Sequence, residues 1–478
     1  MSADVATLVQ NRSSQAGEDE ISSLSAAELV ERYRAKKLSP VEVVRSIIDR
    51  IERLDPHVKS FALLDTESAI NSAKGSEQRW LRGEPLGVVD GVPAALKDLI
   101  LAKGWPTLRG SRAIDPNQEW SEDSPATARL REQGAILLGK TTTSEFGWKA
   151  LGDSPVSGVT RNPWNLAHTP GGSSGGSAAA AALGFGPLHV ATDGAGSTRL
   201  PAAHTGTFGF KPTFGRVPVY PTSQNGTLFH VTPLTRSVRD AALLLDVISR
   251  PDERDWTALP FEAIAWGADL ENGVKGFRIA FSPTLGYAKV DPQVQSIVAD
   301  AVKVFADLGA AVELVDPGIE DPAPIHQIFW FTGAAKLIAS LGERASLAEP
   351  GLQAIAEQGR KVDVLTYLQA VDRREALGRH FNRFHQDWDL LITPTTAYPA
   401  SAIDASQEDL VRNPIRSPFT YPFNLTQQPA ASIPAGLTTA GLPVGLQIIG
   451  PKFSDALVLR AARAFEKARP FGRPHDPS

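Results

Sequence analysis

The 478-residue sequence contains no cysteine, and this absence excludes several kinds of site at once. It rules out disulfides, thiol nucleophiles and cysteine-ligated metal centres. Nine histidines are present, but none belongs to an HExxH motif or to another spacing that is typical of zinc ligands. His380 and His385 are five positions apart, and we interpret them as residues of a helix surface. The sequence therefore predicts no metal ion.

The chain also lacks a basic cluster and a long apolar run. It has 48 lysines and arginines against 53 aspartates and glutamates, so nothing predicts nucleic-acid binding, and a small-molecule substrate is favoured. The Ala-rich stretch after Ser177 is broken by Gly184, Gly186 and Pro187, well short of the ~20 residues of a membrane span. The N-terminus lacks the basic and apolar regions of a secretory signal. We expect a soluble, cytoplasmic protein without a membrane partner, and the sequence leaves open whether it is a homodimer.

Helix starts are the clearest local signals in the N-terminal region. Ser25 precedes AAELVERYRAKK, and Ser39-Pro40 precedes VEVVRSIIDRIERL. Serine is a preferred helix cap, and proline is favoured at the first helical position. Two surface helices are therefore predicted here, after a flexible tail formed by residues 1–22.

The rest of the chain alternates short apolar segments with helical patterns and Gly/Pro turns. This alternation is strongest from about residue 86 to 245 and is typical of an α/β fold. From about residue 322 to 387 the chain becomes helical and richer in aromatic residues. We predict one α/β domain over residues 23–478, with a mixed, mainly parallel twisted sheet sandwiched by helices. The segment 322–387 is expected to be a helical insertion that caps the site.

Two familiar motifs occur but lack their structural context. GxSxG can be read through Ser173 or Ser174, but the preceding RNPWNLAHTP is a loop, whereas a nucleophile elbow needs a strand there. GAILLGKT, from Gly134 to Thr141, fits the phosphate-loop pattern, but its apolar AILL is typical of a strand. LLLD lies within VRDAALLLDVI, which is predicted to be a helix. We therefore reject the elbow and nucleotide-binding interpretations.

The stretch from Gly171 to Ala202 carries the strongest chemical signal, because two Gly/Ser-rich turns bracket a small-residue helix and a short apolar strand. Ser197 follows that strand in TDGAGSTR, where successive backbone amides can converge on an oxyanion. A serine nucleophile needs a base. Lys97, within the apolar run DGVPAALKDLI, is the candidate, although a single lysine is more often an exposed surface residue.

Three motifs together resemble one family. KDLI at Lys97, GGSSGGSA around Ser173 and GAGSTRLPA around Ser197 resemble the amidase signature family, serine hydrolases with a Ser, cis-Ser and Lys triad. The resemblance extends over nearly the whole chain after the tail, including GAILLGKTTTSEFG, DLLITPTTAYPA and GLPVGLQIIGP. It implies the α/β fold of that family and a reaction without a cofactor. It also assigns residues to roles: Ser197 as nucleophile, Ser173 as proton bridge, Lys97 as base, the amides of Gly194, Ala195, Gly196 and Ser197 as oxyanion hole, and Ser174, Asp193 and Arg199 as supports.

Two departures from the family pattern concern the substrate side of the site. Ala195 stands where members usually carry glycine, so a left-handed torsion there would be strained. TTTSEFG replaces the commoner TNxxEFG. For Asp98, next to Lys97, we expect the side chain to point away, because an ion pair would keep the lysine charged.

The predicted activity is cofactor-independent hydrolysis of the C–N acyl bond of a primary amide, anilide or related amide. Trp148, Phe329 and Trp330 are candidate contacts for an apolar substrate, with core packing as the alternative. A carbamate (urethane) or ester would pass through the same tetrahedral intermediate and remains an alternative. A glutamine-hydrolysing subunit of an amidotransferase complex is an alternative of another class. The run after GRV resembles stand-alone amidases rather than such subunits.

Overall fold

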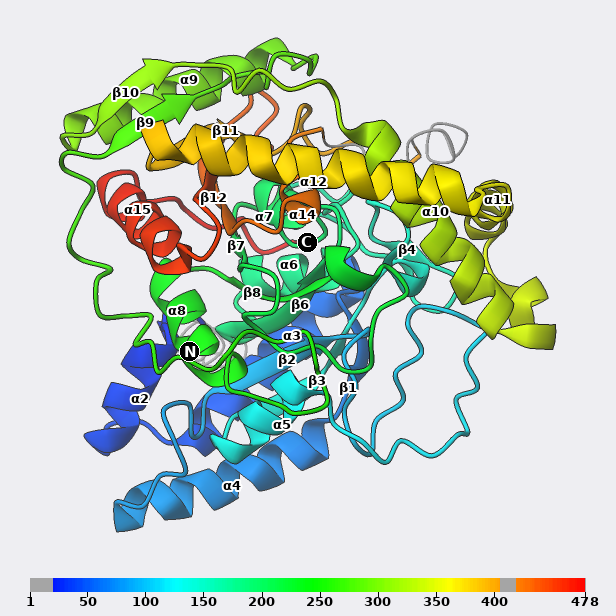
Figure 1. Cartoon of the computed structure of the whole chain (residues 1–478). Coiled ribbons are helices and arrows are strands. Elements are labelled where there is room, and N and C mark those ends of the chain that lie inside the picture. The colour runs from blue at the N-terminus through cyan, green and yellow to red at the C-terminus, as the bar shows by residue number, and fades with distance from the viewer. Residues whose placement is uncertain (1–19, 405–417, 478) are drawn as a thin grey trace.

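The computed structural model describes residues 20–404 and 418–477, which fold around an 11-stranded sheet (Figure 1). The order of the strands is β1-β3-β2-β6-β8-β7-β12-β13-β11-β9-β10, and β4 pairs with β5 separately. The strands are β1 (Phe61–Leu64), β2 (Pro93–Lys97), β3 (Ile136–Thr141), β4 (Asp153–Ser154), β5 (Gly158–Val159), β6 (Leu188–Asp193), β7 (Phe208–Lys211), β8 (His230–Thr235), β9 (Arg278–Phe281), β10 (Ala311–Leu314), β11 (Leu390–Pro394), β12 (Ala430–Leu437) and β13 (Pro443–Ile449).

The sheet is mixed, as predicted. Parallel pairs join β3, β2 and β6 on one side and β11, β9 and β10 on the other. The strands between these two groups pair antiparallel, and so does β1 at its edge. In the parallel group β3-β2-β6, β2 ends at Lys97 and β6 leads directly into the turn that contains Ser197.

Helices flank this sheet, and three 3-10 turns connect elements. The helices are α2 (Ala26–Arg34), α3 (Pro40–Val58), α4 (Thr66–Arg82), α5 (Pro125–Glu132), α6 (Gly175–Ala182), α7 (Arg199–Thr205), α8 (Val238–Ile248), α9 (Pro292–Asp307), α10 (Ala323–Ser340), α11 (Pro350–Arg360), α12 (Val364–Asp387), α14 (Pro422–Leu425) and α15 (Asp455–Ala468). The turns are η1 (Glu145–Gly147), η2 (Gly226–Leu228) and η3 (Gly342–Leu347). Within the described parts of the chain, no helix is long and apolar enough to cross a membrane.

The local predictions at the N-terminal helices are confirmed. Ser25 and Ser39 cap α2 and α3 through capping boxes with Glu28 and Glu42, and Pro40 opens α3. Residues 1–19 of the expected tail lie outside the described residues. Residues 20–23, by contrast, form a helical turn in which Ser22 is buried, so the part of the tail that the structure describes is packed on the domain.

The rejected motifs also fold as the sequence indicated. Residues 136–141 of GAILLGKT form β3, a strand buried along its whole length, so Gly139 and Lys140 belong to the sheet and not to a phosphate loop. VRDAALLLDVI is α8. In both cases the apolar pattern predicted the element correctly.

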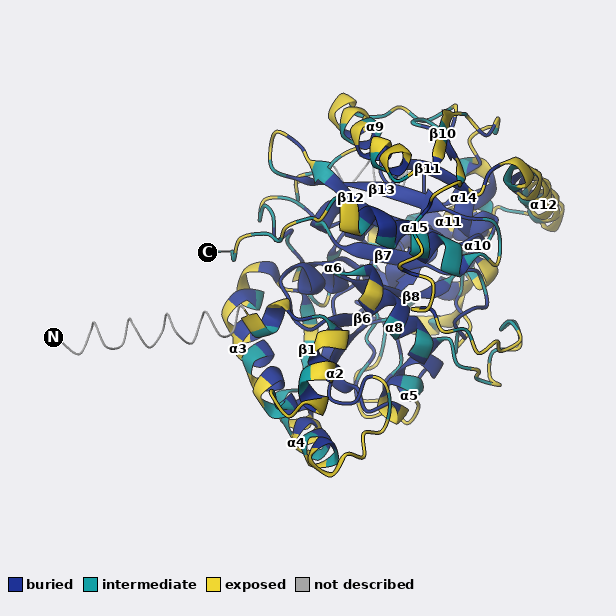
Figure 2. Cartoon of the chain, turned by 90° about the vertical axis from the view of Figure 1, so that its left-hand side faces the viewer, coloured by how far each residue is buried: buried dark blue, intermediate teal, exposed yellow. Residues whose placement is uncertain are grey.

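Residues 323–387 form α10, η3, α11 and α12; in Figure 1, α12 crosses the view near α14, and α10 and α11 lie at the right-hand side of the molecule. Figure 2 shows the sheet buried in the interior and α12 with an exposed outer face. α10 contributes buried residues to two separate apolar clusters, one around Phe329 and the other around Trp330. That this helical segment caps the site stays a prediction.

Candidate active site

Lys97 is the last residue of β2, a strand that is buried throughout. β2 runs parallel to β6, so the carboxyl ends of the two strands meet at the same edge of the sheet. β6 ends with Thr192 and Asp193, and both side chains are buried there with Lys97. The topology therefore brings a lysine, a hydroxyl and a carboxylate together, although 95 positions separate Lys97 from Thr192.

The ammonium nitrogen of Lys97 is surrounded by hydroxyl groups. Its Nζ atom lies 2.7 Å from Ser173 Oγ, 2.9 Å from Ser174 Oγ and 2.9 Å from Thr192 Oγ1. The side chain is fully buried, and burial lowers the pKa of Lys97 well below its usual range, against the opposing effect of Asp193. These neutral partners do not stabilise a charge as a carboxylate would, so the site favours the neutral amine.

Asp98 points away from Lys97, as expected. Its Oδ1 atom lies 3.8 Å from Lys140 Nζ, and Oδ2 accepts a hydrogen bond from the Gly110 amide at 3.2 Å. Burial raises the pKa of Asp98 to about 6 and lowers the pKa of Lys140 to about 8, while each charge partly offsets the effect on the other. Asp98 is therefore engaged by a second lysine rather than by Lys97.

Ser173 and Ser174 lie in the turn that leads into α6. The peptide bond between Gly172 and Ser173 is cis. A Cβ atom at Gly172 would lie 2.1 Å from the backbone oxygen of Leu151, so glycine is required by the close approach of that chain segment. The hydroxyl of Ser174 donates to the carbonyl oxygen of Thr192 at 3.1 Å. Ser174 is thus tied to β6 as well as to Lys97.

Ser197 lies in the second turn, between β6 and α7. The Ser174 amide donates to the carbonyl oxygen of Ser197 at 3.1 Å, which joins the two serine turns. Ser197 is 8% exposed, whereas Ser173 is 1% exposed and Lys97 is not exposed at all. Ser197 is therefore the most accessible of the three side chains, whereas Lys97 is shielded from water.

The turn from Gly194 to Gly196 differs from expectation in two respects. The positive φ angle, +125°, falls on Gly196 and not on Ala195, so the strain expected at Ala195 is absent. The Gly196 amide donates to Asp193 Oδ1 at 2.8 Å, which conflicts with its predicted place in the oxyanion hole. Thr420 Oγ1 donates to the carbonyl oxygen of Ala195 at 2.6 Å and holds the turn from the other side.

Asp193 and Arg199 form a buried ion pair that spans this turn. Arg199 Nη2 lies 2.9 Å from Asp193 Oδ1, and Nε lies 3.0 Å from Oδ2. Burial alone would raise the pKa of Asp193, but Arg199 and the amide of Asn424 outweigh it and hold that pKa well below its usual range. Arg199 also donates to Asn424 Oδ1 at 2.7 Å and to Gln447 Oε1 at 2.8 Å. The predicted supporting residues therefore fix the backbone around Ser197.

Sequence reasoning missed Thr192, Thr420, Asn424 and Gln447. Thr192 could have been found, because it belongs to the end of the strand that leads into the turn with Ser197. The others lie more than 220 positions from Arg199, their partner in the turn. No local pattern marks them.

Of the three aromatic candidates, two reach the site. Trp148 and Trp330 line the small pocket at Ser197, and Trp330 Nε1 donates to the Trp148 carbonyl oxygen at 3.2 Å. Phe329 packs elsewhere, with its ring 5.2 Å from that of Tyr367. Neighbouring residues on a helix point about 100° apart, so Phe329 and Trp330 cannot share one face of α10. The prediction of Phe329 as a substrate contact does not agree with this placement.

The histidines of α12 contact separate backbone carbonyls. His380 Nε2 pairs with Pro317, and His385 Nδ1 lies 3.0 Å from the carbonyl oxygen of Trp388. Across residues 20–404 and 418–477, no group of three or more histidine and carboxylate side chains is arranged to hold a metal ion.

Comparison with known proteins places this arrangement in a family. Residues 42–459 match the family model described as Amidase. The chain is 34% identical to an acylamidase of Rhodococcus erythropolis, covering 94% of this chain and 96% of that protein. It is also 34% identical to a glutamyl-tRNA(Gln) amidotransferase subunit of Myxococcus xanthus (strain DK1622), covering 95% of this chain and 99% of that protein. Among solved structures, a bacterial aryl acylamidase of the amidase signature enzymes matches with a TM-score of 0.87 and 33% identity, covering 94% and 96%.

The extent of these matches agrees with the motifs at Lys97, Ser173 and Ser197, which lie within the matched range. The chain belongs to the amidase signature family and is an amidohydrolase that acts on carbon–nitrogen bonds other than peptide bonds.

Proposed function

We propose that the protein hydrolyses amides through an acyl-enzyme on Ser197, with Ser173 as proton bridge and Lys97 as base. The observation that carries this proposal is that the hydrogen-bond partners of the fully buried Lys97 Nζ are hydroxyl groups, with Ser173 Oγ at 2.7 Å. A neutral amine in such a place is a competent base near neutral pH. Ser197 lines a small pocket in the adjoining turn, which supports its role as the nucleophile.

The proton path follows from the directions of the hydrogen bonds. Ser174 uses its hydrogen on the carbonyl of Thr192, so its oxygen can only accept from Lys97. Ser173 has no such commitment to the backbone among the hydrogen bonds of the described residues. Its hydroxyl can donate to the lone pair of neutral Lys97 and accept the proton of Ser197. Ser173 is thus proposed to relay the proton, whereas Ser174 accepts a hydrogen bond from Lys97.

The proposed reaction consists of acylation of Ser197 followed by hydrolysis of the acyl-enzyme. Ser197 Oγ attacks the carbonyl carbon and its proton passes through Ser173 to Lys97. The tetrahedral intermediate then breaks the C–N bond, and the same proton returns through Ser173 to the leaving nitrogen. Water hydrolyses the resulting ester by the reverse path. The amides of Gly194 and Ala195 are proposed as oxyanion donors, since the amide of Gly196 is already bound to Asp193.

The substrate is proposed to be an amide or anilide with an apolar part, because Trp148 and Trp330 stand beside Ser197. The acylamidase and aryl acylamidase relatives support this choice. The test is turnover of a panel of amides, anilides, carbamates and esters by the purified protein and by Ser197→Ala. We expect turnover of anilides that Ser197→Ala abolishes. Preference for carbamates or esters would change the substrate class, and turnover unaffected by Ser197→Ala would refute the nucleophile.

The amidotransferase relatives favour a second candidate, a glutamine-hydrolysing subunit that works in a complex. Such a subunit purified alone should be inactive on simple anilides and should co-purify with partner proteins. Glutaminase activity that appears only with partners would favour this candidate over the stand-alone amidase.

A further inference from the structure

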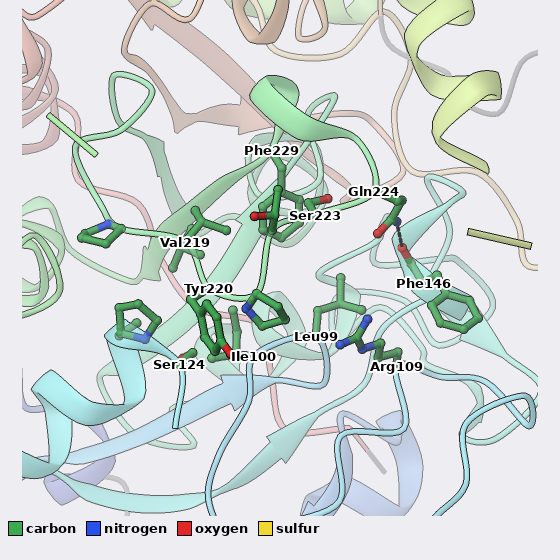
Figure 3. Close-up of a pocket in the computed structure, with 16 residues that line it drawn as sticks. Leu99, Ile100, Arg109, Ser124, Phe146, Val219, Tyr220, Ser223, Gln224 and Phe229 are labelled. Carbon is green, nitrogen blue, oxygen red and sulfur yellow. Dashed lines mark hydrogen bonds between the residues drawn. The ribbon is translucent and has the colours of Figure 1, made fainter. Parts of the chain in front are cut away.

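A second pocket adjoins the site and is shown in Figure 3. Its walls come from the chain after β2, the start of α5, η1 and the segment 218–231. Much of the lining is apolar, including Leu99, Ile100, Val219 and Phe229. None of these residues belongs to the proposed triad, so the pocket is available for a part of the substrate away from the reacting bond.

The pocket meets the Ser197 pocket at η1. Phe146 lines the second pocket, whereas its neighbours Gly147 and Trp148 line the pocket that contains Ser197. A Cβ atom at Gly147 would lie 3.0 Å from Ser173 Oγ and 3.1 Å from Leu99 Cδ1. Leu99, on the wall of the second pocket, and Ser173, the proposed proton bridge, therefore both lie close to Gly147, so the two pockets are near neighbours.

Arg109 brings a positive charge to this wall (Figure 3). The nearby Asp98 carboxylate faces Lys140 at 3.8 Å. Within residues 20–404 and 418–477, no carboxylate oxygen lies within 4.0 Å of the Arg109 guanidinium. Arg109 also lines a neighbouring hollow together with Glu119 and Glu122, and Glu122 accepts a hydrogen bond from the Tyr220 hydroxyl at 3.2 Å. The charge of Asp98 acts on Arg109 only at longer range, so this guanidinium in a partly apolar pocket is suited to an anion supplied by a ligand.

The backbone is conformationally strained at Arg109 and at its hydrogen-bond partner Phe146. Arg109 and Phe146 both have positive φ angles, +55° and +48°, which non-glycine residues rarely adopt. The Phe146 amide donates to the Arg109 carbonyl oxygen at 2.8 Å, so the two strained residues support each other on the wall of one pocket. Strain of this kind gathers at ligand-binding positions.

We propose that this pocket binds an arm of the substrate that ends in a carboxylate, with Arg109 as its counter-ion. The inference rests on the proposed amidase function and names its substrate class: amides with an apolar arm carrying an anionic end. The arm passes along Leu99 and Phe146, and its carboxylate accepts hydrogen bonds from the guanidinium, which offers paired donors to two oxygens.

The test compares matched anilides that differ only in a charged or neutral end group. One pair has a carboxylate or a carboxamide on the ring, and a second pair has it at the end of the acyl chain. For the wild-type protein we expect kcat/KM to favour the carboxylate member of at least one pair. Arg109→Met should lower kcat/KM for that member by about 10- to 100-fold and change the neutral member less than about threefold. Arg109→Lys should lose less than Arg109→Met.

Arg112→Met is the matched control, because Arg112 is exposed on the same loop and does not line the pocket. It should leave both members of each pair unchanged. Equal loss on charged and neutral members in Arg109→Met, or no preference for carboxylates in the wild type, would overturn the inference while the amidase function stands. If no anilide is hydrolysed in a Ser197-dependent way, the proposed function fails and this inference with it.

Discussion

Asp193 and Arg199 face each other across the turn that contains Ser197, with two hydrogen bonds of 2.9 and 3.0 Å between their side chains. Both residues are fully buried, and the carboxylate also accepts hydrogen bonds from the amides of Gly196 and Asn424. The pair therefore fixes the backbone on both sides of the proposed nucleophile. Its loss should affect the fold and the site together.

Replacing Arg199 by methionine should lower the free energy of unfolding by about 3–5 kcal/mol, because Asp193 would remain as an unpaired buried charge. Asp193→Asn combined with Arg199→Met should recover part of that loss. Urea denaturation of the single and double variants measures the effect. Equal losses in the single and double variants would show that the ion pair itself is not the source.

Replacing Lys97 by methionine should remove the dependence of the acylation rate on a base. In the wild type this rate should rise with pH as the lysine loses its proton, and in Lys97→Met it should be low and flat. Stopped-flow acylation by an activated anilide measures it. A profile unchanged by the substitution would exclude Lys97 from the mechanism.

The same variant has a predicted effect on stability. Burial lowers the pKa of Lys97 below its ordinary value of 10.5, so the unfolded chain binds a proton that the folded chain has released. The free energy of unfolding contributed by Lys97 therefore rises with pH from the folded pKa up to about 10.5. Relative to Lys97→Met, the wild type should become more stable between about pH 7 and pH 10, as measured by urea denaturation. A constant difference across this range would contradict the lowered pKa.

Ser173→Ala and Ser174→Ala should differ, although both hydroxyls lie within 2.9 Å of Lys97. Ser173→Ala breaks the proposed proton bridge and should lower kcat by about 10²–10⁴-fold. Ser174→Ala removes a hydrogen-bond acceptor of Lys97 and the hydrogen bond to Thr192, but no step of the proposed proton path, and should cost about tenfold or less. Similar losses in the two variants, measured as kcat on one anilide, would contradict the division of roles.

Trp330→Ala and Phe329→Ala provide a pair of neighbouring substitutions with different expected readouts. Trp330 lines the Ser197 pocket, so its removal should raise KM for aryl amides by about tenfold. Phe329 packs on Tyr367, so its removal should lower the free energy of unfolding by about 3 kcal/mol or more and leave KM nearly unchanged. A KM effect from Phe329→Ala would restore it as a substrate contact.

The fold could be predicted where local pattern decides structure. Apolar runs identified β3 and β6, and serine caps with Pro40 located α2 and α3. The sequence of β12, AASIPAGL, does not indicate a strand, because alanine, proline and glycine are depleted in strands. It forms between β7 and β13: β13 follows it in the chain and pairs with it antiparallel, whereas the pairing with β7 joins segments distant in the chain.

The candidate site, like the fold, could be predicted from the sequence only in part. The sequence by itself determined the family and the candidate reactive groups, because the motifs at Lys97, Ser173 and Ser197 carry the resemblance. Only the tertiary structure decided their states and directions: the hydroxyls around Lys97, the commitment of the Gly196 amide to Asp193, and the separation of Phe329 from Trp330. The physical reason is that burial and hydrogen-bond partners are set by residues up to 248 positions apart, as between Arg199 and Gln447, and sequence patterns do not record such contacts.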